Sequence, residues 1–220
     1  MIFLRENDSR SKRTILLIWI VTALEAINGI LSYLRFNLLD GFFDDDEFIE
    51  SDFVFLDNLD TIFTIVYMAI LVISGIFFIQ WFRRAYFNLH LVSTNLKSSE
   101  GWASGSWFVP FVNLYRPVGI MRELYSRTSE ILVEKKVRFE SKKNIISLWW
   151  TFWILTAVLS NSIMRYSFNI TTLEQVQNLA FMNIILSVLN IILGFLALKV
   201  VNDYIYLEEK LHKINFNSIE

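Results

Sequence analysis

Four long apolar runs constrain the fold of this 220-residue chain more than any other feature. Crossing about 30 Å of hydrocarbon takes roughly 20 helical residues at about 1.5 Å each. The runs that meet this length are 14–34, 61–82, 145–164 and 179–201. Inside lipid, a helix satisfies all of its own backbone hydrogen bonds. The sequence therefore predicts an all-helical integral membrane protein, a four-helix bundle that forms a single membrane domain over residues 1–220.

Composition supports this class, because 54% hydrophobic and 16% aromatic residues give more apolar surface than a soluble domain of this size can bury. The first run follows a basic N-terminus, as the apolar part of a signal peptide would. It is longer than such a part, however, and no small-residue cleavage site follows it. We therefore expect 14–34 to remain as a span.

Charges between the runs predict the orientation, because Lys and Arg near span ends stay on the cytoplasmic side. Eleven basic residues lie between the second and third runs, from Arg83 to Lys143. Between the first and second runs, Arg35 is the only basic residue and stands against nine acidic ones, among them Asp44–Asp46 and Glu47. We therefore expect a multi-pass protein whose two termini and whose segment 83–144 are cytoplasmic.

Several residue types that enzymes and metal sites need are missing or scarce. The chain has no cysteine, hence no thiolate nucleophile and no sulfur ligand, and its two histidines, His90 and His212, are too few for a histidine metal site. Glycine-rich nucleotide motifs are absent, and Ser104 in GWASG does not match G-x-S-x-G. We expect no enzyme activity, no metal and no cofactor, and a net charge of −2 indicates no nucleic-acid partner.

The segment 83–144, which we name the elbow, gathers both prolines of the chain with tryptophans and arginines. Residues 83–97 are expected to continue the helix of the second span, and a Gly- and Ser-containing break follows. The apolar run 107–112 is too short to cross and contains Pro110, so it either lies in the interface or forms a re-entrant turn. From Pro117, apolar residues at helical spacing predict an amphipathic helix over 119–133.

Three roles for the elbow follow from these residues. Arg84 and Arg116 could pair with lipid phosphates beside tryptophans at headgroup depth. Alternatively, Asn113, Arg116 and Glu123 form a buried polar network, or the elbow only links two helical hairpins. The candidate lipid- or partner-binding residues are Arg83, Arg84, Asn88, Trp102, Trp107, Pro110, Asn113, Arg116, Pro117 and Glu123.

The same segment carries a family resemblance over about residues 61–201. It rests on Trp81, Arg84, Ala85, Tyr86, Asn88, Gly101, Trp102, Ala103, Gly105, Trp107, Phe108, Pro110, Asn113, Arg116, Pro117, Met121, Glu123 and Leu124. These residues resemble the signature of a bacterial four-span membrane family, domain of unknown function 4328. That family often has a tryptophan after its Glu-Leu pair, where this chain has Tyr125. The resemblance implies a four-span topology in the bacterial cytoplasmic (inner) membrane and no particular activity or substrate.

Polar residues inside the spans form stripes at helical spacing. One stripe, with Asn28 beside it, holds Thr22, Glu25, Gly29 and Ser32, and another holds Asn183, Ser187, Asn190 and Gly194. Such stripes indicate either close helix packing with hydrogen bonds between helices or a polar path through the bundle. Glu25 is the only acidic residue well inside a span. We interpret it either as a structural carboxyl bonded to Asn190 or another polar neighbour, or as part of an ion or proton pathway.

Beyond the fourth span, the tail 202–220 repeats apolar residues at Tyr204, Leu207, Leu211 and Ile214. This spacing predicts that the helix continues and packs either on the 119–133 helix or on another copy of the chain. The leading functional hypothesis is a non-enzymatic scaffold, sensor or interaction module that docks membrane lipids or a protein partner through the elbow. The alternative is a small transporter or channel that uses Glu25 and the polar residues of the fourth span. The candidate intramembrane polar residues are Glu25, Asn28, Asn183 and Asn190. A lipid-modifying enzyme has the weakest support.

Overall fold

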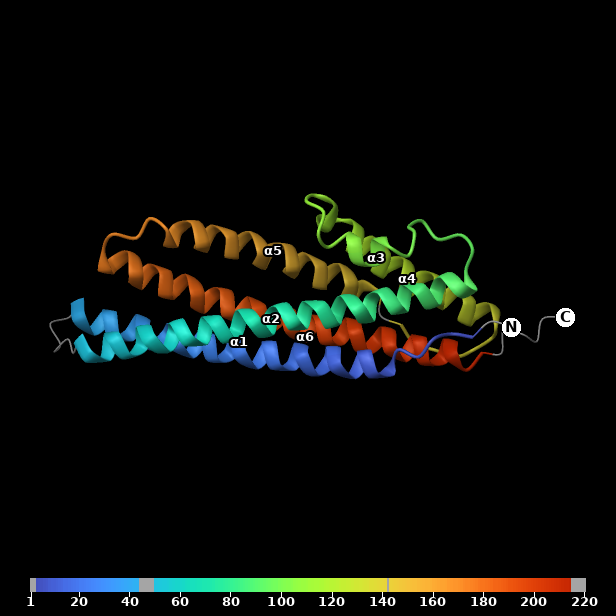
Figure 1. Ribbon diagram of the computed structural model, residues 1–220, viewed down its shortest axis with the longest axis horizontal. Coiled ribbons are helices and arrows are strands. Elements are labelled where there is room, and N and C mark those ends of the chain that lie inside the picture. Colours follow the sequence, from blue (N-terminus) through green and yellow to red (C-terminus); the bar gives the residue numbers. More distant parts are fainter. Residues whose placement is uncertain (1–2, 44–49, 142, 215–220) are drawn as a thin grey trace. The chain divides into compact units, whose positions relative to one another are not determined.

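The computed structural model describes residues 3–43, 50–141 and 143–214, and in these ranges every regular element is a helix. The acidic run 44–47, on which the predicted orientation partly depends, lies outside them. The elements are α1 (Asp8–Phe43), α2 (Glu50–Val92), α3 (Trp102–Gly105), the 3-10 helix η1 (Val112–Leu114), α4 (Arg116–Glu134), α5 (Asn144–Ser167) and α6 (Leu173–His212) (Figure 1). The predicted all-helical fold is confirmed.

The four apolar runs lie inside α1, α2, α5 and α6, and these helices are long and apolar enough to cross a membrane. Helices α2 and α6 have 43 and 40 residues, hence lengths of about 60 Å, roughly twice the hydrocarbon thickness. Each of these two helices therefore continues well beyond its span. The expected continuation of the fourth helix into the tail is confirmed as far as His212.

Contacts within the chain divide it into two compact units. Unit 1 comprises Met1–Ile18, Ile73–Trp150 and Leu196–Glu220, and unit 2 comprises Trp19–Val72 and Thr151–Phe195. Helices α1, α2, α5 and α6 each supply residues to both units.

Large aromatic side chains form the core of unit 1. Trp81, Tyr125 and Tyr204 are fully buried on α2, α4 and α6. The Tyr204 ring lies 6.1 Å from Trp81 and 5.6 Å from Tyr125, and the Tyr125 hydroxyl donates a hydrogen bond of 2.7 Å to the Val200 carbonyl. The tail of α6 therefore packs on α4, which is the intrachain alternative of the two predicted.

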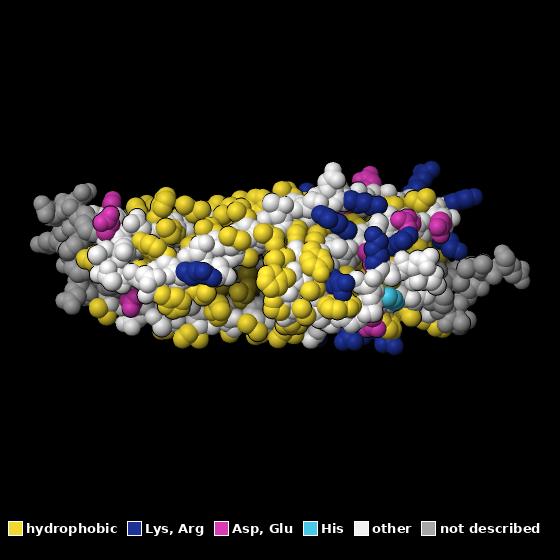
Figure 2. All heavy atoms as spheres, turned by 90° about the horizontal axis from the view of Figure 1, so that it is seen from above, with side chains coloured by type: hydrophobic (Ala, Val, Ile, Leu, Met, Phe, Trp, Pro, Cys, Tyr) yellow, Lys and Arg dark blue, Asp and Glu magenta, His cyan; other side chains and the backbone are white. Residues whose placement is uncertain are grey.

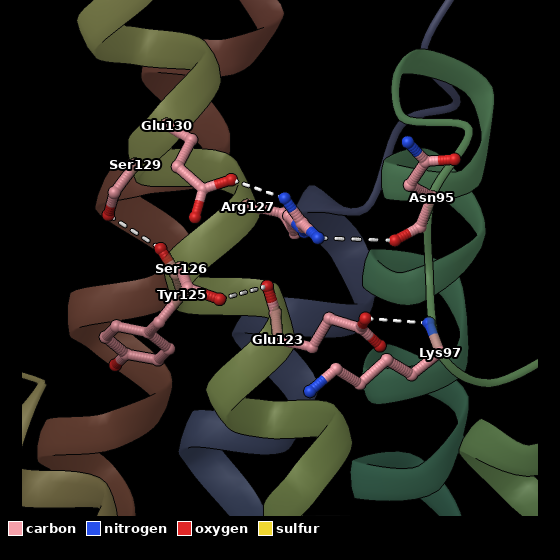
Figure 3. A network of polar contacts seen from close by, with 8 residues as sticks. All are labelled: Asn95, Lys97, Glu123, Tyr125, Ser126, Arg127, Ser129 and Glu130. Atoms are coloured by element: carbon pink, nitrogen blue, oxygen red, sulfur yellow. Dashed lines mark hydrogen bonds and ion pairs between the residues drawn. The ribbon is translucent and has the colours of Figure 1, made fainter.

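The elbow departs from the prediction at one place and agrees at another. Helix α2 ends at Val92, so the expected helix to residue 97 is wrong over its last five residues. The backbone leaves the helix because α4 supplies other partners: the Glu123 carboxylate accepts from the Lys97 N–H at 2.8 Å. Figure 3 shows this contact and the Arg127 side chain reaching the Asn95 carbonyl. The predicted 119–133 helix is confirmed as α4, which begins three residues earlier with Pro117 in its first turn.

Small residues join α1 to α6 in unit 2. A Cβ added at Gly29 would lie 3.3 Å from the Ser187 Cβ, and one added at Gly194 would collide with the Thr22 side chain. The helices therefore approach closely where glycine, serine and threonine occur, as predicted for the packing interpretation of the two stripes. Elsewhere in unit 2, Ile62, Ile65 and Val158 are exposed, as side chains that face lipid are.

Candidate functional site

The elbow loop, residues 102–117, packs within unit 1 against two apolar runs near their ends, the run 61–82 of α2 and the run 145–164 of α5. The Trp107 ring lies 5.5 Å from Phe78 on α2 and 6.0 Å from Trp150 on α5. The Trp150 indole N–H donates a hydrogen bond of 2.8 Å to the Leu114 carbonyl. Because Phe78 belongs to the run 61–82 and Trp150 to the run 145–164, these contacts hold the loop against the apolar part of both helices.

The tip of the loop carries large apolar side chains that the protein does not cover. Phe108 is 74% exposed and Phe111 is 80% exposed, and Val109 and Pro110 between them are also exposed. Phe111 has φ 63° and is centred in a tight turn whose Val112 N–H bonds to the Pro110 carbonyl at 2.7 Å. A positive φ at a bulky residue costs roughly 1–3 kcal/mol, and such strain is found most often at functional sites.

Two of the candidate residues pair with each other beside this tip. The Arg116 guanidinium lies 4.1 Å from the centre of the Trp102 ring, which is a cation–π distance. Figure 2 views this side of unit 1, where dark blue Lys and Arg side chains gather beside yellow hydrophobic side chains over α3 and α4. The loop thus presents a cation and apolar groups together.

Three other candidate binding residues, Asn88, Pro117 and Glu123, are buried and do not face the surface of the loop. Glu123 accepts a hydrogen bond of 2.7 Å from the Tyr86 hydroxyl as well as the one from Lys97. Among the described residues no hydrogen bond joins Asn113, Arg116 and Glu123, so the network expected of these three does not form, because Glu123 reaches α2 instead.

Arg83 and Arg84 belong to a basic cluster that includes two residues not predicted to be part of the site. Arg5 and Arg10 from the N-terminal region line the same cavity of about 290 Å³, together with Gln80, Phe87 and Glu100. We name these four arginines the arginine cluster. The sequence held the signal, because both basic stretches flank spans and were predicted on the same side of the membrane. The sequence did not show that these two basic stretches lie close together in the folded chain.

A buried polar clamp positions the N-terminal segment beside α2. The Asn88 amide exchanges two hydrogen bonds with the backbone of Arg5, donating to its carbonyl at 2.8 Å and accepting from its N–H at 2.9 Å. The Asn88 amide also donates to the Glu208 carboxylate at 3.0 Å, and the Asn7 amide donates to the same carboxylate at 3.0 Å. We name Asn7, Asn88 and Glu208 the polar clamp.

Glu208 lies seven residues beyond the fourth apolar run and is only 4% exposed. Burial raises the pKa of its carboxyl above the ordinary value of 4.5, and the hydrogen bonds from Asn7 and Asn88 offset part of that rise. The sequence placed this residue in the helical tail 202–220, whose apolar spacing predicted packing of that helix but did not single out Glu208 as a buried carboxyl.

The intramembrane polar residues come together in unit 2. Glu25 is 3% exposed and accepts hydrogen bonds from the Tyr67 hydroxyl and from the Asn190 amide, the latter at 2.9 Å. Asn28 donates to Ser187 at 3.1 Å. The predicted contact between Glu25 and Asn190 is confirmed, whereas the partner Tyr67 on α2 was missed, because a single tyrosine in a span is not by itself a signal.

A polar cavity of about 240 Å³ adjoins this group in unit 2. Its lining includes Asn28, Asn183 and Tyr67, with Arg35 and Asp60 joined by an ion pair of 2.9 Å. Tyr67 therefore lies between the cavity and Glu25. Within the described parts of the chain, no three His, Cys, Asp or Glu side chains gather as metal ligands would.

Four helices long and apolar enough to cross a membrane, with buried polar groups that join α1, α2 and α6, define a multi-pass helical membrane protein. The family model for the domain of unknown function DUF4328 matches residues 50–205, so the chain belongs to this family. The comparisons with curated proteins and with solved structures give no match.

Proposed function

We propose that this protein is a non-enzymatic interaction module of the bacterial cytoplasmic membrane that docks on lipid headgroups through its elbow loop. Both termini and the elbow lie on the cytoplasmic side in this proposal, as the charges flanking the spans predict. The observation that carries it is the exposed apolar tip with Phe108 and Phe111, on a loop that packs against the apolar runs of α2 and α5 near their ends.

The depth of the loop favours lipid over a protein partner. Trp107 and Leu114 contact Phe78 and Trp150, so the outward side of the loop faces the interfacial region that surrounds the span ends. In that region each large apolar side chain that leaves water contributes about 1.5–3 kcal/mol. The stacked pair of Trp102 and Arg116 supplies an aromatic ring and a cation, the groups that anchor proteins at headgroup depth.

Single-cysteine labelling tests the proposal without background, because the native chain has no cysteine. A polarity-sensitive fluorophore is attached to Phe108→Cys and, as the matched control, to Glu134→Cys at the exposed end of α4. In vesicles that contain brominated lipids, we expect strong quenching at position 108 and little at position 134.

Equal, weak quenching at both positions would contradict lipid docking by the loop. If position 108 were instead quenched by water-soluble iodide until a binding partner was added, the loop would be a protein-docking surface, and the lipid proposal would be wrong.

The polar cavity beside Glu25 supports a second candidate function, a small transporter or channel. In this candidate, a proton or small cation enters past Asn28 and Tyr67, and Glu25 is the acceptor at the end of the path. Glu25→Gln keeps an acceptor for Tyr67 and Asn190 but cannot exchange a proton. We expect ion or proton flux into vesicles to fall by at least about tenfold in Glu25→Gln if a proton is carried; equal flux in both proteins, or none above empty vesicles, would exclude Glu25 as a carrier.

A further inference from the structure

The arginine cluster carries more positive charge than the carboxyl groups described beside it can neutralise. Arg5, Arg10, Arg83 and Arg84 line one cavity with a single carboxylate, Glu100, which lies 3.3 Å from Arg83. Two of the guanidinium groups share one ring, since Arg5 lies 4.2 Å and Arg84 lies 5.8 Å from the centre of Phe87. Arginine side chains that line one cavity repel each other, and an anion bound among them relieves this repulsion.

The cluster is held in place and is not a chance meeting of mobile side chains. The polar clamp fixes the backbone of Arg5 to Asn88, one residue after Phe87 on α2. Next to it, Thr14 on α1 donates a hydrogen bond of 3.1 Å to the Phe77 carbonyl of α2, which fixes the helix that carries Arg10. Buried contacts on both sides therefore maintain the proximity of the four arginines.

The charges around Arg84 are those expected of an anion-binding site. Arg84 lies just beyond the second apolar run. Its partial burial lowers the pKa of the guanidinium, and the charges of Arg10 and Arg5 lower it further, while Glu100 opposes them. The charge of Arg84 also lowers the pKa of the buried Glu208. The four arginines still outnumber these two carboxyl groups.

We propose that the arginine cluster binds the phosphate of an anionic phospholipid headgroup. Guanidinium groups match phosphate because they donate two parallel hydrogen bonds and remain charged. A lipid, not a free phosphate, is the occupant because Gln80 and Arg83 flank the end of the second apolar run, where headgroups lie. Phe87 provides an apolar floor beside the charges. The inference rests on the proposed function only for this membrane depth; the residues of the loop tip take no part in the site.

Equilibrium binding of acyl-labelled phosphatidylglycerol to the full-length protein in neutral detergent micelles tests the site, with labelled phosphatidylcholine as the neutral reference. We expect the wild-type protein to prefer phosphatidylglycerol by about tenfold or more, and Arg10→Gln/Arg84→Gln to lose that preference. The matched control, Lys135→Gln/Arg138→Gln, removes two exposed cations elsewhere in the elbow and should keep it.

Arg10→Gln alone provides a second variant in case the double variant does not fold. The structure gives the Arg10 side chain no hydrogen bond to the described residues, so its replacement breaks none of them, and we expect the preference to fall by about threefold. The micelle assay reads the arginine cluster through its headgroup preference, whereas the quenching experiment at position 108 reads the loop tip, so that failure of the loop proposal and failure of this site remain distinguishable.

Three outcomes would overturn the proposal. The Arg10→Gln/Arg84→Gln variant could retain the full preference, or the control variant could lose as much as the cluster variant, which would mean that net charge alone decides. An excess of inorganic phosphate could displace the lipid, which would identify a soluble phosphate as the occupant.

Discussion

Among the described residues, the fully buried large aromatic rings lie in unit 1, whereas in unit 2 the helices α1 and α6 approach each other closely where glycine, serine and threonine occur. In unit 1, Trp81 contacts Phe78 and Tyr204 at 5.6 and 6.1 Å, and Glu208 accepts from two asparagines. In unit 2, Gly194 leaves room only for the Thr22 side chain. Rigid aromatic packing is suited to holding a loop and an arginine cluster in a fixed geometry. In unit 2, the close approach of α1 and α6 brings polar groups of the two helices together, as in the hydrogen bond of 2.9 Å from Asn190 to Glu25.

The largest effect is expected from the aromatic core. Trp81→Ala removes a fully buried indole and should lower the free energy of unfolding in detergent by about 3–5 kcal/mol. Trp19→Ala in unit 2, where the indole is 49% exposed and meets Phe195, should lower it by about 1 kcal/mol or less. Equal losses in the two variants would mean that unit 1 does not depend on its aromatic core more than unit 2 does.

The polar clamp should show the next largest effect. Glu208→Leu leaves the Asn7 and Asn88 amides without their shared acceptor and should cost about 2–4 kcal/mol, whereas Glu208→Gln retains one acceptor oxygen and should cost less.

The raised pKa of Glu208 also predicts a pH dependence. Because the folded protein favours the neutral carboxyl, this residue contributes full stability below the ordinary value of 4.5 and loses it as the pH rises through the higher folded pKa. The unfolding temperature of Glu208→Gln should therefore fall less steeply with rising pH than that of the wild type. Parallel pH profiles of the two proteins would show that the carboxyl does not carry the dependence.

The close contact in unit 2 should give a smaller change. Gly194→Ala places a methyl group against Thr22 and should lower the unfolding free energy by about 1–3 kcal/mol. Gly75→Ala is the matched control, because no heavy atom lies within 4 Å of its added Cβ, and it should raise helix stability by roughly 0.5–1 kcal/mol. If both substitutions stabilised the protein, α1 and α6 would not be in close contact at Thr22.

The sequence predicted the parts of this protein that depend on local pattern. Run length identified the four apolar helices, and the spacing of small and polar residues identified the face of α1 that meets α6, down to the pair of Glu25 and Asn190. Pro117 and the apolar spacing after it identified α4. These features are set within about 20 residues of chain, so periodicity and propensity reach them.

The remainder depends on contacts between distant segments. The end of α2 at Val92 follows from Glu123, which binds the backbone at Lys97, 26 residues away. The burial of Glu208 follows from Asn7, 201 residues away. No local pattern contains these partners, and for that reason the arginine cluster was found only when the N-terminal segment was seen beside α2.

The depth of position 111 tests the central claim most directly. A nitroxide attached to Phe111→Cys, in the full-length protein in bilayers, reports its accessibility to oxygen, which concentrates in lipid, and to a water-soluble nickel complex. Because the Phe111 side chain is 80% exposed at the loop tip, we predict greater accessibility to oxygen, with the label on the acyl side of the phosphates. Greater accessibility to the nickel complex, at the level of a label on Glu134→Cys, would contradict docking of the elbow loop on lipid.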